Sequence, residues 1–136
     1  MFHLDTCICI DFLRGRLPHT LNTLRTSDPR SFGVPAVVEA ELRLGALKSA
    51  SPEKNLRTVE AFLLPFQTVP FDVSAAREYA EIRSELERAG KLIGPNDLLI
   101  AATARAHGAV LVTHNTKEFL RVPRLRLEDW DEVPFS

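Results

Sequence analysis

The sequence predicts an α/β domain built around a short, mostly parallel sheet. Short apolar runs alternate along the chain with longer segments of helical periodicity, which is the order expected when helices connect parallel strands. The run Ala109–Val112 is apolar throughout, as in a strand buried on both faces. The chain has 136 residues, 45% hydrophobic and 26% charged, so we expect one globular domain over residues 1–136 and no disordered architecture.

The elements are expected in a regular order with recognisable helix ends. Strands are predicted at Phe2–Leu4, Phe32–Val34, Phe66–Val69, Ala109–Val112 and Arg124–Leu127. Helices are predicted at Thr6–Leu13, Leu17–Arg25, Ala36–Leu47, Glu53–Leu64, Val73–Ala89 and Asp97–His107. Gly15, Gly90 and Gly108 follow three of these helices, where the chain often needs a positive φ. Pro18 and Pro95 stand near helix starts, where a missing N–H costs little.

The charge balance and the cysteine content exclude several classes of protein. Lys and Arg number 17, and Asp and Glu 18, giving a net charge of −1, which excludes a generally basic coat but not a local basic rim. Cys7 and Cys9 are too few for a disulfide framework, and we expect them to be free buried thiols. No apolar run reaches the roughly 18 residues of a membrane span, and the N-terminus does not resemble a signal peptide. We therefore expect a cytoplasmic protein.

Glu41 lies on the inward side of the third predicted helix. Val38 falls on the same side at about 100° per residue, so a partly buried carboxylate is expected, and its burial is costly unless it is paired or bound to a cation. The simpler alternative is an ion pair with Lys48 on the same face. Glu39 falls on the opposite side with Arg43, four residues later, as an exposed ion pair.

Two aspartates stand beside elements expected in the core. Asp5 directly follows the first strand, where it is a helix N-cap, a functional carboxylate or both. Asp97 opens a helix that is apolar nearly all round, and the structural alternative is that it only complements the N-terminal dipole of that helix. Because Asn96 is an equally good cap, Asp97 has no evident structural duty.

Oxygen donors also follow the buried strand Ala109–Val112. They are Thr113, Asn115 and Glu118. The alternative for each residue taken singly is an ordinary loop that leads into a short helix capped by Thr116.

In a parallel sheet, the carboxylates and other oxygen donors described above would gather beyond the carboxyl ends of the strands. Several carboxylates within a few ångströms repel one another at low dielectric, and they coexist only if some are protonated or a cation sits between them. Oxygen donors without His or Cys favour a hard ion such as Mg²⁺ or Mn²⁺. Mg²⁺ held by few carboxylates keeps several waters, which can supply a nucleophile.

Four segments, in order, give the chain a family resemblance. They are LDT-x₃-ID-x-LRG at Leu4–Gly15, EAELRLGA at Glu39–Ala46, GPNDLLIAA at Gly94–Ala102 and AVLVTHNTKEF-x-RVP-x-L at Ala109–Leu125. Together they resemble PIN-domain ribonucleases, and specifically the VapC-type toxins of bacterial toxin–antitoxin pairs. The likeness runs from the first strand to Trp130, essentially the whole chain.

The resemblance implies a three-layer α/β/α fold and a metal-dependent endoribonuclease. It implies that Asp5, Glu41 and Asp97 are the acidic catalytic residues, and we expect Asp5 and Asp97 to be direct ligands of Mg²⁺ or Mn²⁺. It also implies a homodimer, a VapB-like antitoxin that blocks the site, and operator DNA bound through the antitoxin. Family substrates are structured RNAs, often tRNA, and the branch that the C-terminal half most resembles cuts initiator tRNA.

Two positions depart from the family pattern. Cys7 stands where many members carry Asn, and Asn115 stands where the fourth acidic residue is often Asp. Asn115 is a neutral oxygen donor, so we expect Glu118 to supply the fourth catalytic carboxylate and Thr113 to fix a carboxylate ligand. RNA also requires basic flanks, and we expect Arg14, Arg43, Lys117 and Arg121 to provide them.

Two other functions stay open. A PIN-like binding module without catalysis is favoured by Asn115, although three retained carboxylates that repel one another argue against it. An aspartate-based phosphatase would use Asp5 as its nucleophile, but Cys7 stands where a second aspartate is expected.

Overall fold

The chain folds around a five-stranded sheet in which all neighbouring strands are parallel. The structure is a computed structural model and describes residues 1–16 and 18–130. The strands are β1 (Phe2–Leu4), β2 (Phe32–Pro35), β3 (Gln67–Val69), β4 (Val110–Val112) and β5 (Arg126–Glu128). Their order across the sheet is β3-β2-β1-β4-β5, so the first strand of the chain lies at the centre. The predicted α/β class and parallel sheet are confirmed.

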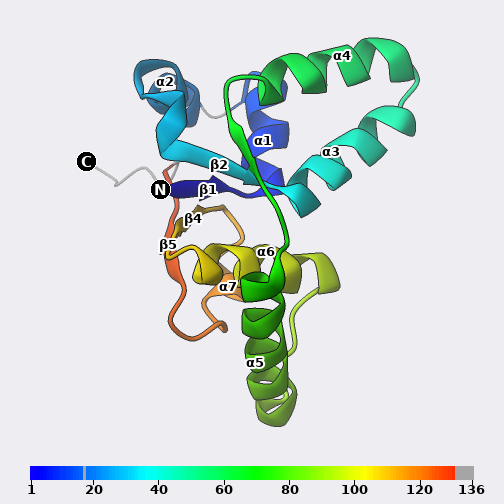
Figure 1. The fold of residues 1–136 in the computed structure, drawn as a ribbon. Coiled ribbons are helices and arrows are strands. Elements are labelled where there is room, and N and C mark those ends of the chain that lie inside the picture. The colour runs from blue at the N-terminus through cyan, green and yellow to red at the C-terminus, as the bar shows by residue number, and fades with distance from the viewer. Residues whose placement is uncertain (17, 131–136) are drawn as a thin grey trace.

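Helices cover both faces of this sheet and give three layers (Figure 1). One face carries α1 (Thr6–Leu13), α2 (Pro18–Thr26), α3 (Ala36–Leu47) and α4 (Pro52–Leu63), and the other carries α5 (Val73–Ala89), α6 (Pro95–Ala106) and α7 (Thr116–Phe119). A 3₁₀ turn at Pro29–Ser31 leads into β2. Among the described helices, none combines the length and the apolar character needed to cross a bilayer.

Several element boundaries differ from the predictions by one or two residues, and two of these differences have clear local reasons. Helix α6 begins at Pro95, with Gly94 rather than Asn96 at the cap position, because proline fits the first turn of a helix. Strand β5 begins at Arg126 because Arg124 has a φ of 58°, and this left-handed conformation interrupts extended backbone. Leu17, the expected first residue of the second helix, lies outside the described residues.

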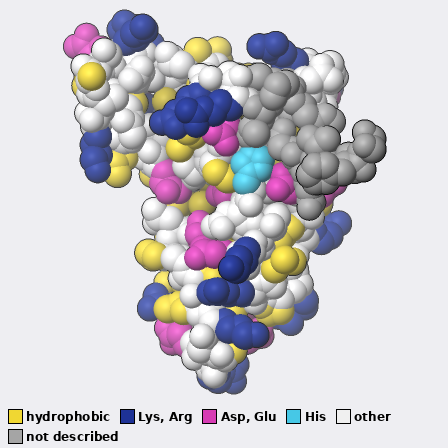
Figure 2. Space-filling model, turned by 180° about the vertical axis from the view of Figure 1, so that it is seen from behind, with side chains coloured by type: hydrophobic (Ala, Val, Ile, Leu, Met, Phe, Trp, Pro, Cys, Tyr) yellow, Lys and Arg dark blue, Asp and Glu magenta, His cyan; other side chains and the backbone are white. Residues whose placement is uncertain are grey.

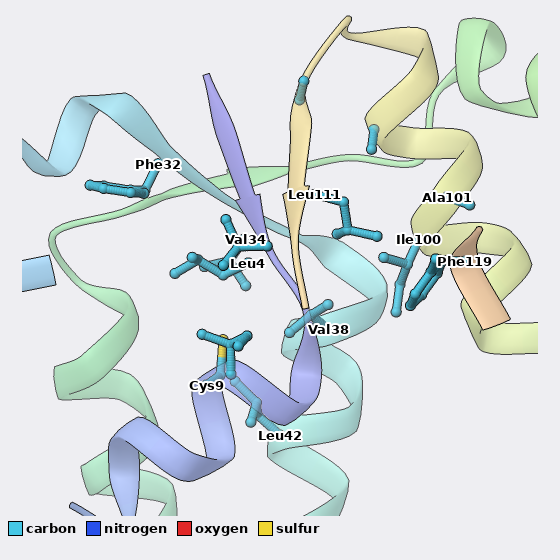
Figure 3. Close-up of a cluster of buried hydrophobic side chains, with 14 of the residues drawn as sticks. Leu4, Cys9, Phe32, Val34, Val38, Leu42, Ile100, Ala101, Leu111 and Phe119 are labelled. Carbon is cyan, nitrogen blue, oxygen red and sulfur yellow. The ribbon is translucent and has the colours of Figure 1, made fainter. Parts of the chain in front are cut away.

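The core lies on both sides of the sheet and holds the carboxyl ends of the strands in place. Figure 3 shows Leu4, Val34, Val38, Leu42 and Cys9 on one side and Leu111, Ile100, Ala101 and Phe119 on the other. All of these side chains are buried, and each large one stabilises the fold by about 1.5–3 kcal/mol. The residues that follow β1, β2 and β4 therefore start from rigid positions.

A buried guanidinium ties the helices of the second face together. Arg105 on α6 is only 6% exposed and forms ion pairs with Glu78 at 2.5 Å and Glu81 at 3.3 Å on α5. It also donates to the carbonyl oxygen of Pro123 at 3.1 Å. One side chain thus joins α5, α6 and the segment that follows α7.

Strand β2 has a glycine where it faces His3. A Cβ at Gly33 would lie 2.7 Å from a methyl group of Val69 and 3.2 Å from the His3 ring, so no larger residue fits there. His3 is fully buried, and neither ring nitrogen has a hydrogen-bond partner among the described residues. Burial, followed by the charge of His107, lowers the pKa of His3 to about 4.

His3 should make the protein sensitive to acid. Because its pKa is about 4 when folded and about 6.5 when unfolded, the unfolded chain binds the proton more tightly. Its contribution to stability is fully present above pH 6.5 and is lost as the pH falls towards 4. Between pH 7 and pH 4, the free energy of unfolding should fall by about 3 kcal/mol less in His3→Leu than in the unsubstituted protein. Urea unfolding at each pH measures this difference. Equal losses in the two proteins would contradict this account.

Candidate active site

Asp5 lies at the carboxyl end of the central strand, where hydrogen bonds fix both of its oxygens. Its backbone N–H donates to the carbonyl of Val112 at 3.0 Å. As the N-cap of α1, its Oδ1 accepts from the backbone N–H of Thr6 at 2.8 Å. Its Oδ2 accepts from Thr113 Oγ1 at 2.7 Å and from Cys7 Sγ at 3.4 Å. The N-cap role is confirmed, and it leaves the carboxylate beside the other candidate residues.

Glu41 reaches the same region from α3. Its side chain is half-buried, as predicted, and its Oε1 accepts from Thr6 Oγ1 at 2.7 Å. Thr6 therefore joins Asp5 and Glu41, a role that sequence reasoning missed. In the part of the chain that the structure describes, no ion pair joins Glu41 to Lys48, so the simpler alternative for Glu41 is wrong.

Asp97 lies in the first turn of α6, where other carboxylates surround it. Its pKa is raised from 3.8 to about 7. The causes, in decreasing order, are burial, a hydrogen bond with Glu118, and the negative charges of Asp5, Glu118 and Glu41. Asp97 therefore lies within electrostatic reach of the other three predicted carboxylates, although they come from four different segments of the chain.

The segment after β4 completes the cluster. Thr113 is buried, donates to Asp5, and accepts a hydrogen bond from the backbone N–H of Asn115 at 2.9 Å. The Asn115 side chain donates to Glu118 Oε2 at 3.2 Å. Helix α7 begins at Thr116 with Asn115 at the cap position, so Thr116 is not the cap that the sequence predicts. Thr113 fixes a carboxylate as expected, and Asn115 contacts Glu118.

The two cysteines have different environments. Cys9 is free and fully buried in the core, as predicted. Cys7 is also free but only half-buried, and it lies against Asp5 and 3.7 Å from Thr113 Oγ1. Burial, followed by the charge of Asp5, raises the pKa of the Cys7 thiol to about 11, so it stays protonated at neutral pH. Its departure from the family's Asn was the one sequence signal that pointed to this position.

The donor set fits a hard divalent cation. The donors are oxygens only, from Asp5, Glu41, Asp97 and Glu118. The pKa of Asp97 is raised by burial and also by negative charges that a cation would neutralise. Within residues 1–16 and 18–130, no three such groups converge closely enough to ligate one ion as they stand.

Basic residues flank the acidic cluster on the surface. Figure 2 shows acidic side chains and a histidine near the middle of one face, with Lys and Arg side chains above and below them. Arg14, Lys117 and Arg121 are exposed. Arg43 instead forms the predicted ion pair with Glu39 at 2.9 Å, and a second with Glu60 at 3.3 Å.

A groove of about 310 Å³ runs beside the site between α1, α3 and α4. Glu41 and Arg14 line it together with apolar side chains that include Ile10, Leu42 and Val59. A polypeptide segment that lies in this groove would contact one of the candidate catalytic carboxylates.

Known proteins share both this sequence and this fold. A model of the PIN domain family matches residues 3–125. The tRNA(fMet)-specific endonuclease VapC of Shigella flexneri is 40% identical over 129 residues, which cover 95% of this chain and 97% of that protein. Ribonuclease VapC2 of Rickettsia felis is 38% identical over 133 residues, covering 97% and 99%. The crystal structure of Rickettsia felis VapBC2 bound to a promoter DNA fragment contains a chain that superposes with a TM-score of 0.90 at 38% identity, covering 96% of this chain and 98% of that one.

Proposed function

The chain belongs to the PIN domain family and, within it, to the VapC ribonucleases, and from this premise we propose that it is a metal-dependent endoribonuclease that cleaves tRNA. Initiator tRNA is the specific substrate we propose, since the Shigella flexneri relative is named for tRNA(fMet). The observation that carries the proposal is the electrostatic influence of Asp5, Glu41 and Glu118 on Asp97, whose pKa is raised to about 7 by burial and then by these neighbours.

Each side chain of the site has a separate role in the proposed phosphodiester hydrolysis. A bound Mg²⁺ or Mn²⁺ supplies a counter-charge for the phosphate and makes water more acidic. Asp5 and Asp97 would hold this ion, with Thr113 fixing Asp5. Glu41, held by Thr6, orients the attacking water. Burial, followed by a hydrogen bond with Glu118, raises the pKa of Asp97 to about 7 while no ion is bound.

Purified protein incubated with total tRNA tests this function. We expect discrete fragments in Mg²⁺ or Mn²⁺ and none in EDTA. Glu41→Gln should lower the rate strongly, whereas Glu39→Gln, the same change on the other side of α3, should leave the rate unchanged because Glu39 pairs with Arg43. Cleavage in EDTA would overturn the metal dependence. No cleavage by folded, metal-loaded protein would favour the alternative of a PIN-like binding module.

RNA binding should depend on the basic flanks and on salt. We propose that Arg14, Lys117 and Arg121 contact phosphates, whereas Arg43 would first have to leave its ion pairs. Lys117→Ala combined with Arg121→Ala should weaken tRNA binding and reduce the slope of log K against log salt by about 1 per lost contact, measured by fluorescence anisotropy. Arg83→Ala, on α5, is the matched control because Arg83 is paired with Glu87. An unchanged slope in the double variant would contradict these assignments.

We also propose that a VapB-like antitoxin blocks the site, that the chain forms a homodimer, and that operator DNA is contacted through the antitoxin. The Rickettsia felis complex of VapBC2 with promoter DNA supports the antitoxin and DNA parts of this proposal. The groove beside Glu41 offers a surface on which an antitoxin segment would reach the site. A tRNA substrate places the activity in the cytoplasm.

A further inference from the structure

The thiol of Cys7 fills an acceptor position on one oxygen of Asp5. An ionised carboxylate offers about four such positions, two on each oxygen. Oδ2 accepts from Thr113 Oγ1 at 2.7 Å and from Cys7 Sγ at 3.4 Å, whereas Oδ1 accepts from the Thr6 N–H at 2.8 Å. Among the contacts of the described residues, the position left open on this carboxylate is therefore on Oδ1.

The sulfur is itself fixed in place. Cys7 lies in the first turn of α1, whose start Asp5 caps. The backbone N–H of His114 donates to the sulfur, and Thr113 Oγ1 lies 3.7 Å away. The carboxylate Oδ2 is nearer to the sulfur than the Thr113 hydroxyl is, and it is charged, so it is the stronger acceptor for the thiol hydrogen.

We infer that Cys7 is a positioning residue that restricts Asp5 to coordination through a single oxygen and so favours Mg²⁺ over the larger Ca²⁺. The inference rests on the proposed function, because it requires Asp5 to be a metal ligand. Mg²⁺ demands a compact octahedral set, whereas Ca²⁺ accepts carboxylates through one or both oxygens. With Oδ2 filled by two donors, only Oδ1 is open to an ion, and this suits Mg²⁺.

Calorimetric titration of the full chain with Mg²⁺ alone and with Ca²⁺ alone, without RNA, tests the inference. Cys7→Ala should weaken Mg²⁺ binding by about tenfold, as expected when a ligand loses a hydrogen bond. It should weaken Ca²⁺ binding less, so the preference for Mg²⁺ over Ca²⁺ should become smaller. Cys7→Ser keeps a donor on the same carbon and should restore the original preference. Cys9→Ala is the matched control, because it removes a thiol from the core side of the same helix and should leave the preference unchanged.

The outcomes separate this inference from the function on which it rests. Equal changes in Mg²⁺ and Ca²⁺ affinity in Cys7→Ala, or no change in either, would overturn the positioning role while leaving the metal site intact. No Mg²⁺ binding by the unsubstituted protein would overturn the proposed metal site itself. Cys7→Val, which fills the space without a donor, should match Cys7→Ala and serves if the alanine variant does not fold.

Discussion

Replacing Asp97 with Asn is expected to abolish RNA cleavage and, at the same time, to stabilise the metal-free protein. The loss of cleavage should exceed about a hundredfold, since removing a hydrogen-bond partner of a ligand alone costs 10–100-fold. The gain in stability follows from the cost of ionising Asp97, because burial, a hydrogen bond with Glu118 and the neighbouring negative charges raise its pKa to about 7. Asn keeps the shape of the side chain but removes its charge.

The pH dependence of this gain has a definite sign. Because the folded protein binds the Asp97 proton more tightly than the unfolded chain, whose pKa is 3.8, ionisation of Asp97 destabilises the fold. The penalty is absent below pH 3.8, grows as the pH rises, and is complete above about 7. We expect Asp97→Asn to raise the free energy of unfolding by about 1–2 kcal/mol at pH 8 in EDTA and by much less at pH 5. The gain is limited to this size because solvent screens the half-exposed side chain.

Urea unfolding and tRNA cleavage of the same preparations measure the two effects. Asp72→Asn is the matched control, because Asp72 caps α5 through its side chain and Asn caps a helix equally well. It should change neither stability nor cleavage. Cleavage retained in Asp97→Asn would remove Asp97 from the catalytic site, and a loss of stability at pH 8 would contradict the predicted cost of ionising Asp97.

Removing the Arg105 guanidinium should lower the free energy of unfolding more than any other substitution proposed above. Arg105→Ala leaves the Glu78 carboxylate, 29% exposed, without its ion-pair partner, and breaking a buried pair in this way costs about 3–5 kcal/mol. It also removes the hydrogen bond to Pro123. We expect a loss of about 3 kcal/mol in urea unfolding, since Glu78 is not fully buried.

Two further variants isolate the cause of that loss. Adding Glu78→Gln to Arg105→Ala should recover part of it, because the double variant no longer carries an unpaired carboxylate. Arg83→Ala, which removes an exposed ion pair with Glu87, should cost less than about 1 kcal/mol. If Arg105→Ala and Arg83→Ala cost the same, Arg105 does not hold α5 and α6 together.

The sequence predicted the elements well where local signals decide them. The apolar run at Ala109–Val112 forms a buried strand, and Gly90 ends its helix in the left-handed conformation at a φ of 66°. Asp5 combines a cap position with a place at the end of β1, and both follow from the order of residues along the chain. Local periodicity and cap chemistry are properties of neighbouring residues, so a single sequence records them.

Local signals of this kind could not predict which side chains contact one another within the site. The Thr6–Glu41 hydrogen bond spans 35 residues, and the Cys7–Thr113 contact spans 106. Helical periodicity gives no information about which loop will meet a side chain from another segment. The resemblance to the family named the carboxylates but not Thr6, and Cys7 appeared only as a departure from the pattern.

The central place of β1 has a consequence during protein synthesis. Strand β1 is synthesised more than a hundred residues before β4, so one of its edges stays unpaired until β4 has been made. Long-range pairing of this kind slows folding, and an unpaired edge exposes the incomplete chain to aggregation. Glu118, the last of the four carboxylates, is synthesised after β4. A fragment that ends before that point lacks the complete set of acidic groups, so the four carboxylates are present together only after α7 has been made.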